Sequence, residues 1–348
     1  MHIKKFCISF ILSTLLLQSF AQETSNLVSI IGTGDILLGS NYPSDSQLPP
    51  RDGKDLFKNV KDILRSADVT FGNLEGCILN SGGTPKTCKS SQCYLFRMPD
   101  RYVENLVDAG YDVMSVANNH NGDFGEAGRK NTIKVLKEAG LHYAGLESIC
   151  ETSEFEINGV RYGFCAFAPN MGTVKINNHD YAKKLVAGLK AKCDIVIVSF
   201  HGGAEGSGHN RVTRKTENFF GENRGNVYEF AHAVIDAGAD VVFGHGPHVV
   251  RAAELYKDRF IIYSLGNFCT AGTISINGIS GYAPIVKVYT EKNGKFVKGQ
   301  IYSAIQLDKT GPVMDKKHSA AKEIKRLTEL DFPEAKISIS DEGEIKRK

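Results

Sequence analysis

The sequence has no long apolar run beyond its first twenty-one residues, whereas a membrane-spanning helix needs about 20 consecutive apolar residues. It also lacks a strong charge of either sign, because 42 Lys and Arg stand against 39 Asp and Glu for a formal net charge of +3. Internal repeats and low-complexity tracts are absent too. These absences argue against a multi-span membrane protein and against a nucleic-acid partner, which would favour a basic surface.

The N-terminal segment has the pattern of a secretory signal. Lys4 and Lys5 precede the apolar run FCISFILSTLLL, and small residues lead to an expected cut after Ala21. We therefore expect residues 1–21 to be removed and the mature chain to be periplasmic or extracellular, with no transmembrane segment left. Loss of the two lysines lowers the net charge from +3 to about +1. The alternative is an uncleaved N-terminal anchor.

The cysteine spacings match no zinc-binding pattern. One of the eight cysteines, Cys7, lies in the signal, so seven remain in an oxidising destination. We expect one loop disulfide that uses Cys88 or Cys93, both close to Cys77 in the sequence. The cysteines in apolar, strand-like segments are expected to be buried thiols: Cys165, Cys193 and Cys269.

The pattern of apolar residues alternates between strands and helices over the first two thirds of the chain. Strand-like segments such as VSIIGTG, DVTFGN, DIVIVSF and DVVFG are separated by helical periodicity, as in GRKNTIKVLKEAG. Hairpins turn on Asn158-Gly159 and Asn293-Gly294. The expected fold is α/β, with two mixed sheets packed together and helices outside, in one domain over residues 28–307. Residues 308–348 are predicted to form a charged surface helix and a frayed tail.

Residues that can bind a metal ion or transfer a proton follow five of the expected strands. The carboxyl ends of parallel strands share one edge of a sheet, so these side chains should meet there. Carboxylate, amide and imidazole groups together suit Zn, Mn or Fe(II) better than Ca or Mg, and the set is large enough for one or two ions. Two ions about 3.5–4 Å apart can hold a bridging hydroxide as nucleophile. The candidates are Asp35, Glu75, Asn119, His120, His201, His245 and His248.

Each candidate also has an ordinary explanation, and only their coincidence at strand ends favours a metal site. Asp35 could be a turn residue, and Asp123 could be a helix cap. A second group could orient the ligands or could be plain loop polarity: Asn73, Asn118, Asp123, Glu205 and Asn267. Three arginines could present charge to an anionic substrate: Arg97, Arg224 and Arg251. The other histidines are taken as ordinary: His142, His179, His209, His232 and His318.

Six motifs occur in a fixed order: GDILLG, NLEG, ANNHNGDFG, FHGGAEG, GHGPHVVRAAELY and YSLGNF. In this set the chain resembles the CapA family of bacterial capsule synthesis proteins, within the calcineurin-like metallophosphatase superfamily, over about residues 28–290. The resemblance implies a four-layered α/β/β/α sandwich and a dinuclear metal centre. It also implies a role in poly-γ-glutamate or capsule assembly.

The resemblance gives each candidate a role. It implies that Asp35 and His248 bind a first ion, that Glu75 bridges two ions, and that His120 donates a proton to the leaving group. The second ion would be bound by Asn119, His201 and His245. The superfamily usually has a histidine at the position of Leu37, so the first ion is expected to lose one ligand and to be weakly held or absent.

The expected function is that of a secreted metal-dependent hydrolase or transferase. It would act on an anionic cell-envelope polymer or its precursor through a metal-activated hydroxide, in association with the capsule synthesis or export machinery. Whether the bond is a γ-glutamyl amide or a phosphoester stays open. One alternative is a non-catalytic polymer-binding or assembly factor that uses the same metal-bearing cleft. A further alternative is a generic metallophosphoesterase.

Overall fold

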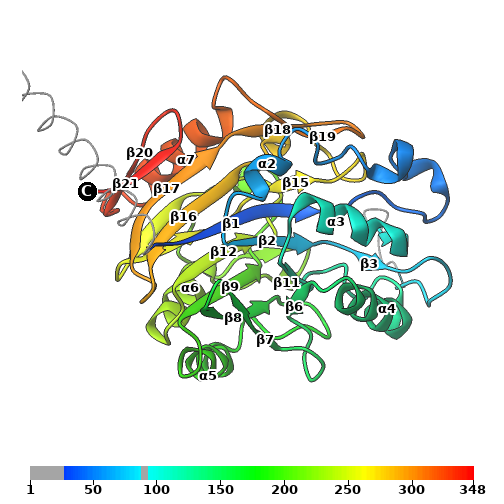
Figure 1. Ribbon diagram of the computed structural model, residues 1–348, viewed down its shortest axis with the longest axis horizontal. Helices are drawn as coiled ribbons and strands as arrows, with labels where there is room; N and C mark the ends of the chain where they lie inside the picture. The colour runs from blue at the N-terminus through cyan, green and yellow to red at the C-terminus, as the bar shows by residue number, and fades with distance from the viewer. Residues whose placement is uncertain (1–26, 88–92) are drawn as a thin grey trace, which may run out of the picture.

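The computed structural model describes residues 27–87 and 93–348, which form two mixed β-sheets packed face to face with helices outside them (Figure 1). The predicted signal of residues 1–21 and Cys88 lie outside the described residues. Over the part that is described, no helix has both the length and the apolar character to cross a bilayer. The α/β/β/α architecture expected from the sequence is confirmed by this arrangement.

The larger sheet has nine strands in the order β20-β21-β17-β16-β1-β2-β5-β6, with β15 pairing with β1. Strands β1, β2, β5 and β6 are parallel, whereas β16, β17, β21 and β20 extend the sheet in antiparallel fashion. Their bounds are β1 Leu27–Ile36, β2 Val69–Leu74, β5 Val113–Ser115, β6 His142–Ala144, β15 Asn267–Cys269, β16 Ile285–Glu291, β17 Phe296–Tyr302, β20 Ile337–Ile339 and β21 Glu344–Arg347.

The second sheet has six strands in the order β13-β14-β12-β9-β8-β7. Its four central strands are parallel, and a hairpin strand closes each edge. The bounds are β7 Thr152–Ile157, β8 Val160–Phe167, β9 Ile195–His201, β12 Val241–His245, β13 Ala253–Tyr256 and β14 Arg259–Ile262. The hairpin predicted at Asn158-Gly159 joins β7 to β8, and both turn residues have positive φ.

Helices cover the outer face of each sheet. Helices α5 and α6 pack on β8, β9 and β12, and α2, α3 and α4 share a core with the outer face of β1 and β2. The bounds are α2 Lys61–Leu64, α3 Val103–Ala109, α4 Gly125–Glu138, α5 His179–Lys190, α6 Val227–Asp236 and α7 Ser319–Asp331. Short 3₁₀ turns lie at Asp45–Gln47, Pro50–Gly53, Asp100–Tyr102, Ser207–His209 and Gly278–Gly281. The small two-stranded sheets are β3 Cys77–Ile78 with β4 Arg97–Met98, β10 Asn218–Phe219 with β11 Glu222–Asn223, and β18 Ala304–Leu307 with β19 Gly311–Met314.

Aromatic rings hold the two sheets together. Phe71 of β2 stacks on Phe243 of β12 with ring centroids 5.4 Å apart, and it also contacts Phe164 of β8. A glycine at position 32 permits this approach, since a Cβ there would lie 2.4 Å from the Phe243 ring. Neighbouring residues of β1 face opposite sides, so Ile30 belongs to the core between the sheets and Ile31 to the core under the helices.

The C-terminal segment is part of the main sheet. The sequence suggested a surface helix followed by a frayed tail, but β21 pairs with β17, and α7 buries Ile324 and Leu327 in the main core. The charged residues hid this strand, because a strand that is buried on one face only needs an apolar residue at every second position.

Most cysteines agree with expectation. Cys165, Cys193 and Cys269 are free buried thiols, as is Cys77 in β3, and Cys150 is free and half-buried. Cys93 is disulfide-bonded. The free thiols therefore act as small apolar core residues.

We predict that the Phe71 ring, stacked between the two sheets, contributes strongly to the free energy of unfolding. Phe71→Ala should lower the free energy of unfolding by about 3–5 kcal/mol, because it removes a fully buried ring and leaves a cavity. Phe220→Ala is the matched control, since that ring is 77% exposed and should contribute less than about 0.5 kcal/mol. Urea unfolding followed by circular dichroism measures both, and similar losses in the two variants would contradict this description of the core.

Candidate metal centre

The register of the parallel strands brings the candidate residues to one edge of the sandwich. In the nine-stranded sheet, Asp35 lies opposite Asn73 on one side and Asn267 on the other. In the facing sheet, His201 lies directly opposite His245. The carboxyl ends of β1, β2, β9 and β12 thus place polar side chains on the same edge, although the strands are far apart in sequence.

Two carboxylates and one imidazole form the centre of this group. Asp35 and Glu75 are fully buried, and His248 Nδ1 lies 3.2 Å from Asp35 Oδ2 while its Nε2 lies 3.6 Å from Glu75 Oε1. One potential ligand atom from each residue lies within 4.8 Å of the others. These three residues can hold a cation between the two sheets.

The Glu75 carboxylate has no hydrogen-bond partner among the described residues, although both of its oxygens are buried. His201 Nε2 and Asn119 Oδ1 are buried without partners as well. Glu75 Oε1 is 3.6 Å from His248 Nε2 and 4.0 Å from His201 Nε2. Two atoms that bind one ion at about 2.1 Å each lie at most about 4.2 Å apart, so Glu75 can share an ion with either histidine. The donor set therefore fits a divalent cation, with Glu75 in a position to bridge.

Burial and mutual repulsion perturb the protonation of this centre. Burial raises the pKa of Glu75 well above its usual value, and the Asp35 charge adds to the shift. Burial alone would lower the pKa of His248, but the Glu75 and Asp35 carboxylates outweigh it and raise that pKa to about 10. Burial holds the pKa of His201 well below its usual range, so that ring is neutral, as a metal ligand must be. The His248 imidazolium is the cation that lies in contact with both carboxylates, Asp35 and Glu75.

Amide side chains fix the orientation of the ligands. Asn73 Nδ2 donates to Asp35 Oδ1 at 2.8 Å, and Asn118 Nδ2 donates to Asn73 Oδ1 at 3.3 Å. His248 Nδ1 donates to Asn267 Oδ1 at 2.9 Å, which leaves Nε2 as the metal-binding nitrogen of that ring. Partners of this kind hold a ligand in the tautomer that a metal requires.

His120 lies beside the centre with a carboxylate partner of its own. Its Nδ1 donates to Asp123 Oδ2 at 2.7 Å, and Asp123 also accepts from the backbone N–H of Phe96 at 2.7 Å. The Phe96 ring packs against the imidazole, and Lys86 forms an ion pair with the second oxygen of Asp123. Burial lowers the pKa of His120, and Asp123 opposes that shift. Nε2 remains free to exchange a proton.

His245, a predicted ligand, and Leu37, where a ligand is missing, both contact other parts of the protein. His245 Nε2 donates to the carbonyl oxygen of Thr33 at 3.0 Å, and Ser199 Oγ donates to its Nδ1 at 3.4 Å. In this orientation both ring nitrogens have hydrogen-bond partners and the ring connects the two sheets, so the binding of a second ion by His245 stays a prediction. Leu37, where the resemblance implied a missing ligand, is fully buried in the core under the helices.

The three arginines have protein partners. Arg251 was expected to face a substrate, but it is fully buried and makes a bidentate pair with Glu217 at 2.8 Å. Arg97 donates to Asn41 and to the carbonyl oxygen of Gly82 and stacks over Phe124. Arg224 pairs with Glu205 at 2.9 Å at the edge of the centre. Only Arg224 therefore lies where an anion at the centre could feel its charge.

Sequence reasoning missed the loop between β3 and β4. This segment supplies Lys86 and Phe96 to the His120–Asp123 pair, and Glu217 holds Arg251 from a different loop. No periodicity or motif marks these residues, because they reach their partners only through tertiary contacts. The histidines set aside as ordinary include His142, which stacks on Phe155, and His232, which pairs with Glu254.

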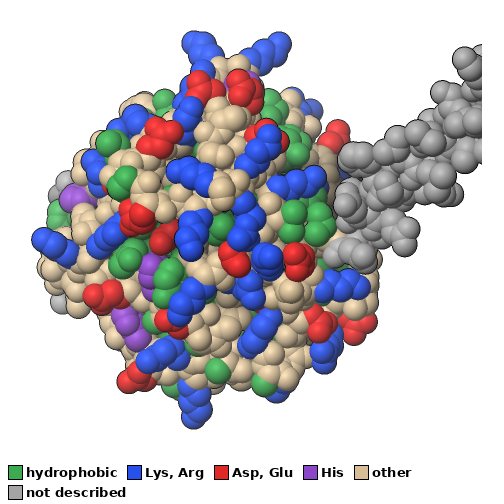
Figure 2. Space-filling view, turned by 90° about the vertical axis from the view of Figure 1, so that its left-hand side faces the viewer, with side chains coloured by type: hydrophobic (Ala, Val, Ile, Leu, Met, Phe, Trp, Pro, Cys, Tyr) green, Lys and Arg blue, Asp and Glu red, His purple; other side chains and the backbone are tan. Residues whose placement is uncertain are grey.

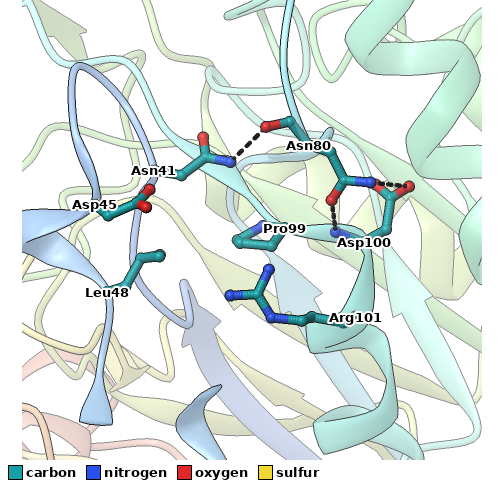
Figure 3. A pocket seen from close by; sticks show the side chains of 7 residues that line it. All are labelled: Asn41, Asp45, Leu48, Asn80, Pro99, Asp100 and Arg101. Carbon is teal, nitrogen blue, oxygen red and sulfur yellow. Dashed lines mark hydrogen bonds between the residues drawn. The ribbon is translucent and has the colours of Figure 1, made fainter. Parts of the chain in front are cut away.

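A separate open cavity of about 530 Å³ lies away from these ligands (Figure 3). Arg101 points into it, and the Asn80 side chain bonds with Asp100 at its wall. The complete lining is Asn41, Asp45, Leu48, Asn80, Pro99, Asp100 and Arg101. None of the metal-centre residues lines this cavity.

The unpartnered Glu75 carboxylate predicts a stabilisation by metal that depends on this residue. Mn²⁺ or Zn²⁺ at about 100 times its dissociation constant should raise the melting temperature by roughly 5–10 °C. Glu75→Gln should abolish most of that rise, whereas Glu126→Gln, at a side chain that is 74% exposed, should retain it. Differential scanning fluorimetry with and without chelator measures the shift, and equal shifts in both variants would place the metal elsewhere.

Comparisons with known proteins agree with the motifs. The chain is 30% identical over 254 residues to the capsule biosynthesis protein CapA of Bacillus anthracis. The matched region covers 68% of this chain and 58% of that protein. It is 26% identical over 261 residues to the PGA biosynthesis protein CapA of Bacillus subtilis strain 168, with 70% and 64% covered. The chain thus spans less than two thirds of the length of either relative.

Two solved structures match this chain at low similarity. A hypothetical protein from Thermus thermophilus matches with a TM-score of 0.49 and 15% identity, over 79% of this chain and 98% of that one. A 5'-nucleotidase precursor from the same organism matches with a TM-score of 0.44 and 12% identity, over 82% and 56%.

The family comparison covers the six-stranded sheet and the whole candidate centre, but not strands β16, β17, β20 and β21 of the larger sheet. A family model described as bacterial capsule synthesis protein PGA_cap matches residues 29–271, well over half of the chain. The protein therefore belongs to the PGA_cap family of bacterial capsule synthesis proteins.

Proposed function

We propose that this protein is an exported, metal-dependent hydrolase or transferase that acts on an anionic cell-envelope polymer or its precursor. The observation that carries the proposal is the buried, unpartnered Glu75 carboxylate between His248 and His201, in a chain of a capsule synthesis family. The N-terminal signal pattern supports export to the periplasm or the cell exterior. Capsule or poly-γ-glutamate synthesis is the process in which we place it, with the synthesis or export machinery as partner.

In the proposed hydrolysis, some residues of the centre would bind metal ions and His120 would transfer a proton. Asp35, Glu75 and His248 would hold a first ion of Zn, Mn or Fe(II), and Asn119 and His201 offer free ligand atoms for a second. A bound divalent ion would lower the pKa of a water molecule and stabilise negative charge on the bond to be cleaved. His120, oriented by Asp123, presents Nε2 to the leaving group and transfers a proton there. His248 and Glu205 are the partly exposed members, so the substrate would approach from their side.

A non-catalytic polymer-binding or assembly factor is the second candidate. It is favoured by Leu37, which removes one ligand, and by His245, whose ring nitrogens are both engaged in hydrogen bonds. A centre that binds one ion without completing a second site could recognise the carboxylates of an acidic polymer without cleaving it. Turnover distinguishes the two candidates.

The proton-transfer role of His120 predicts a specific loss of activity. With Mn²⁺ or Zn²⁺, the protein should cleave either γ-glutamyl oligomers or phosphoesters, and His120→Ala should lower kcat by about 10²–10⁴-fold. Its metal content should be unchanged, because His120 is not placed as a ligand. Chromatographic assay of the products measures the cleavage.

His232→Ala is the matched control, because His232 also pairs with a carboxylate, Glu254, but away from the centre. This variant should keep kcat within about twofold below its melting temperature. If the wild type binds metal and γ-glutamyl polymer yet cleaves none of these substrates, the enzyme proposal is wrong and the assembly role remains.

A further inference from the structure

The open cavity in Figure 3 has the size and the mixed lining of a small-molecule site. Its volume of about 530 Å³ lies within the roughly 300–1,000 Å³ that such sites span. Three of its lining residues come from the segment after β1, one from the segment after β3, and three from the turn before α3. Leu48 and Pro99 are apolar, and the other lining residues are polar or charged.

A network of amide hydrogen bonds fixes one wall of the cavity. Asn80 Nδ2 donates to Asp100 Oδ2 at 2.9 Å, and the backbone N–H of Asp100 donates to Asn80 Oδ1 at 2.9 Å. Asn131 Nδ2 donates to Asp100 Oδ1 at 2.7 Å, and Asn41 Nδ2 donates to the carbonyl oxygen of Asn80 at 2.9 Å. An ionised carboxylate has about four acceptor positions, so Asp100 keeps some of them for a ligand.

A strained segment holds Arg101 in its place at the cavity. Asp52 Oδ1 accepts from Arg101 Nε at 2.9 Å and from Nη2 at 2.7 Å, which leaves Nη1 without a partner among the described residues. Arg51 and Asp52 have φ of 52° and 55°, a left-handed conformation that costs free energy for residues other than glycine. Asn105 Nδ2 supports this turn by donating to the carbonyl oxygen of Asp52 at 2.8 Å. Strain of this kind persists where the surroundings enforce it, and it is frequent at ligand sites.

The charges of the cavity disfavour an anionic ligand. Asp45 and Asp100 contribute −2 and Arg101 contributes +1, so the lining residues sum to −1, and Arg101 is already paired with Asp52. The Asp45 side chain has no hydrogen-bond or ion-pair partner in residues 27–87 and 93–348, so it is a free acceptor. A cationic ligand would leave the Arg101 Nη1 donor unmatched. The ligand that suits both kinds of group is neutral and carries donors and acceptors together.

We propose that this cavity binds a neutral saccharide unit, at a site separate from the metal centre. The hydroxyl groups of a sugar ring donate to Asp45 and Asp100, and their oxygens accept from Arg101 Nη1. The C–H groups of the ring pack on Leu48 and Pro99, as in sites where apolar surface surrounds a few orienting polar groups. This is a second binding function, and it does not depend on a metal ion.

Saturation-transfer difference NMR on the purified protein with a chelator present tests the proposal without any contribution from metal. The probes are the neutral disaccharides maltose, cellobiose and N,N′-diacetylchitobiose. At least one of them should bind in the millimolar range or more tightly, and Arg101→Ala should weaken that binding at least about tenfold. Arg65→Ala is the matched control and should stay within about twofold, because Arg65 also pairs with an exposed aspartate, Asp108, but does not line the cavity.

Two further variants separate ligand contact from folding. Asp45→Ala removes an acceptor that has no described protein partner, so it should weaken binding and leave the melting temperature unchanged. Asp52→Asn removes the anionic partner of Arg101 but keeps a residue that tolerates the left-handed conformation, so it should also weaken binding. Circular dichroism checks that each variant is folded, and Asp45→Ala carries the test if the Arg101 variant is not.

Each outcome of these titrations decides for or against a saccharide site. Binding that is weakened by Arg101→Ala and Asp45→Ala but not by Arg65→Ala supports it. If the folded wild type binds none of the three sugars, or if all variants bind them equally well, the proposal is wrong. If oligomers of γ-linked glutamate bind with the same dependence on Arg101, the ligand is anionic and a neutral saccharide is excluded. Because the chelator is present throughout, none of these results bears on the proposed hydrolase.

Discussion

The burial of the Glu75 carboxylate is the constraint on which the rest of the centre depends. An ionised carboxylate without partners is expensive inside a protein, and Asp35 increases the cost by placing a second negative charge nearby. The His248 imidazolium lies beside both carboxylates. They raise the pKa of His248 to about 10, although burial alone would lower it. A divalent cation would replace that proton and satisfy both carboxylates. The proposed metal ion would thus complement this buried pair of carboxylates.

The surrounding fold keeps this site rigid. Parallel strands align Asn267, Asp35 and Asn73 in one row, and amide hydrogen bonds fix their orientation. Gly246 lets the two histidine-bearing segments approach closely, since a Cβ there would lie 2.6 Å from the carbonyl oxygen of Gly202, and its φ of +113° favours glycine. The contact between the sheets through Phe71 and Phe243 sets their separation. Stability between the sheets and geometry at the edge therefore come from the same packing.

The outer surface of the protein has a different character from the buried centre. Lysine and arginine side chains are numerous on the face in Figure 2, but acidic side chains lie between many of them. Surface ion pairs such as Lys257 with Asp236 and Arg347 with Asp258 show how opposite charges balance on this chain. The mixture agrees with the small net charge of +3 and gives no basic tract on this face of the kind that binds nucleic acid.

The sequence predicted the parts of the molecule that depend on local pattern. Alternating apolar segments indicated the α/β sandwich, and polar residues after β1, β2, β9 and β12 indicated which edge carries the site. It could not predict that the Arg251 side chain turns inward, because its partner Glu217 is fixed only by the folded loop. The Thr33 contact of His245 and the Lys86 contact of Asp123 depend in the same way on tertiary structure. The final strand β21 was missed because its charges resemble those of a solvated tail.

The central claim is that a metal ion neutralises Glu75. The most direct measurement is an anomalous difference map from crystals of the protein grown with Mn²⁺. The account predicts a peak at bonding distance from Glu75 Oε1 and His248 Nε2, with His248 Nδ1 still within hydrogen-bond distance of Asn267 Oδ1. A map without a peak at Glu75, in crystals saturated with Mn²⁺, would contradict it and would show that the buried carboxylate is stabilised by His248 alone.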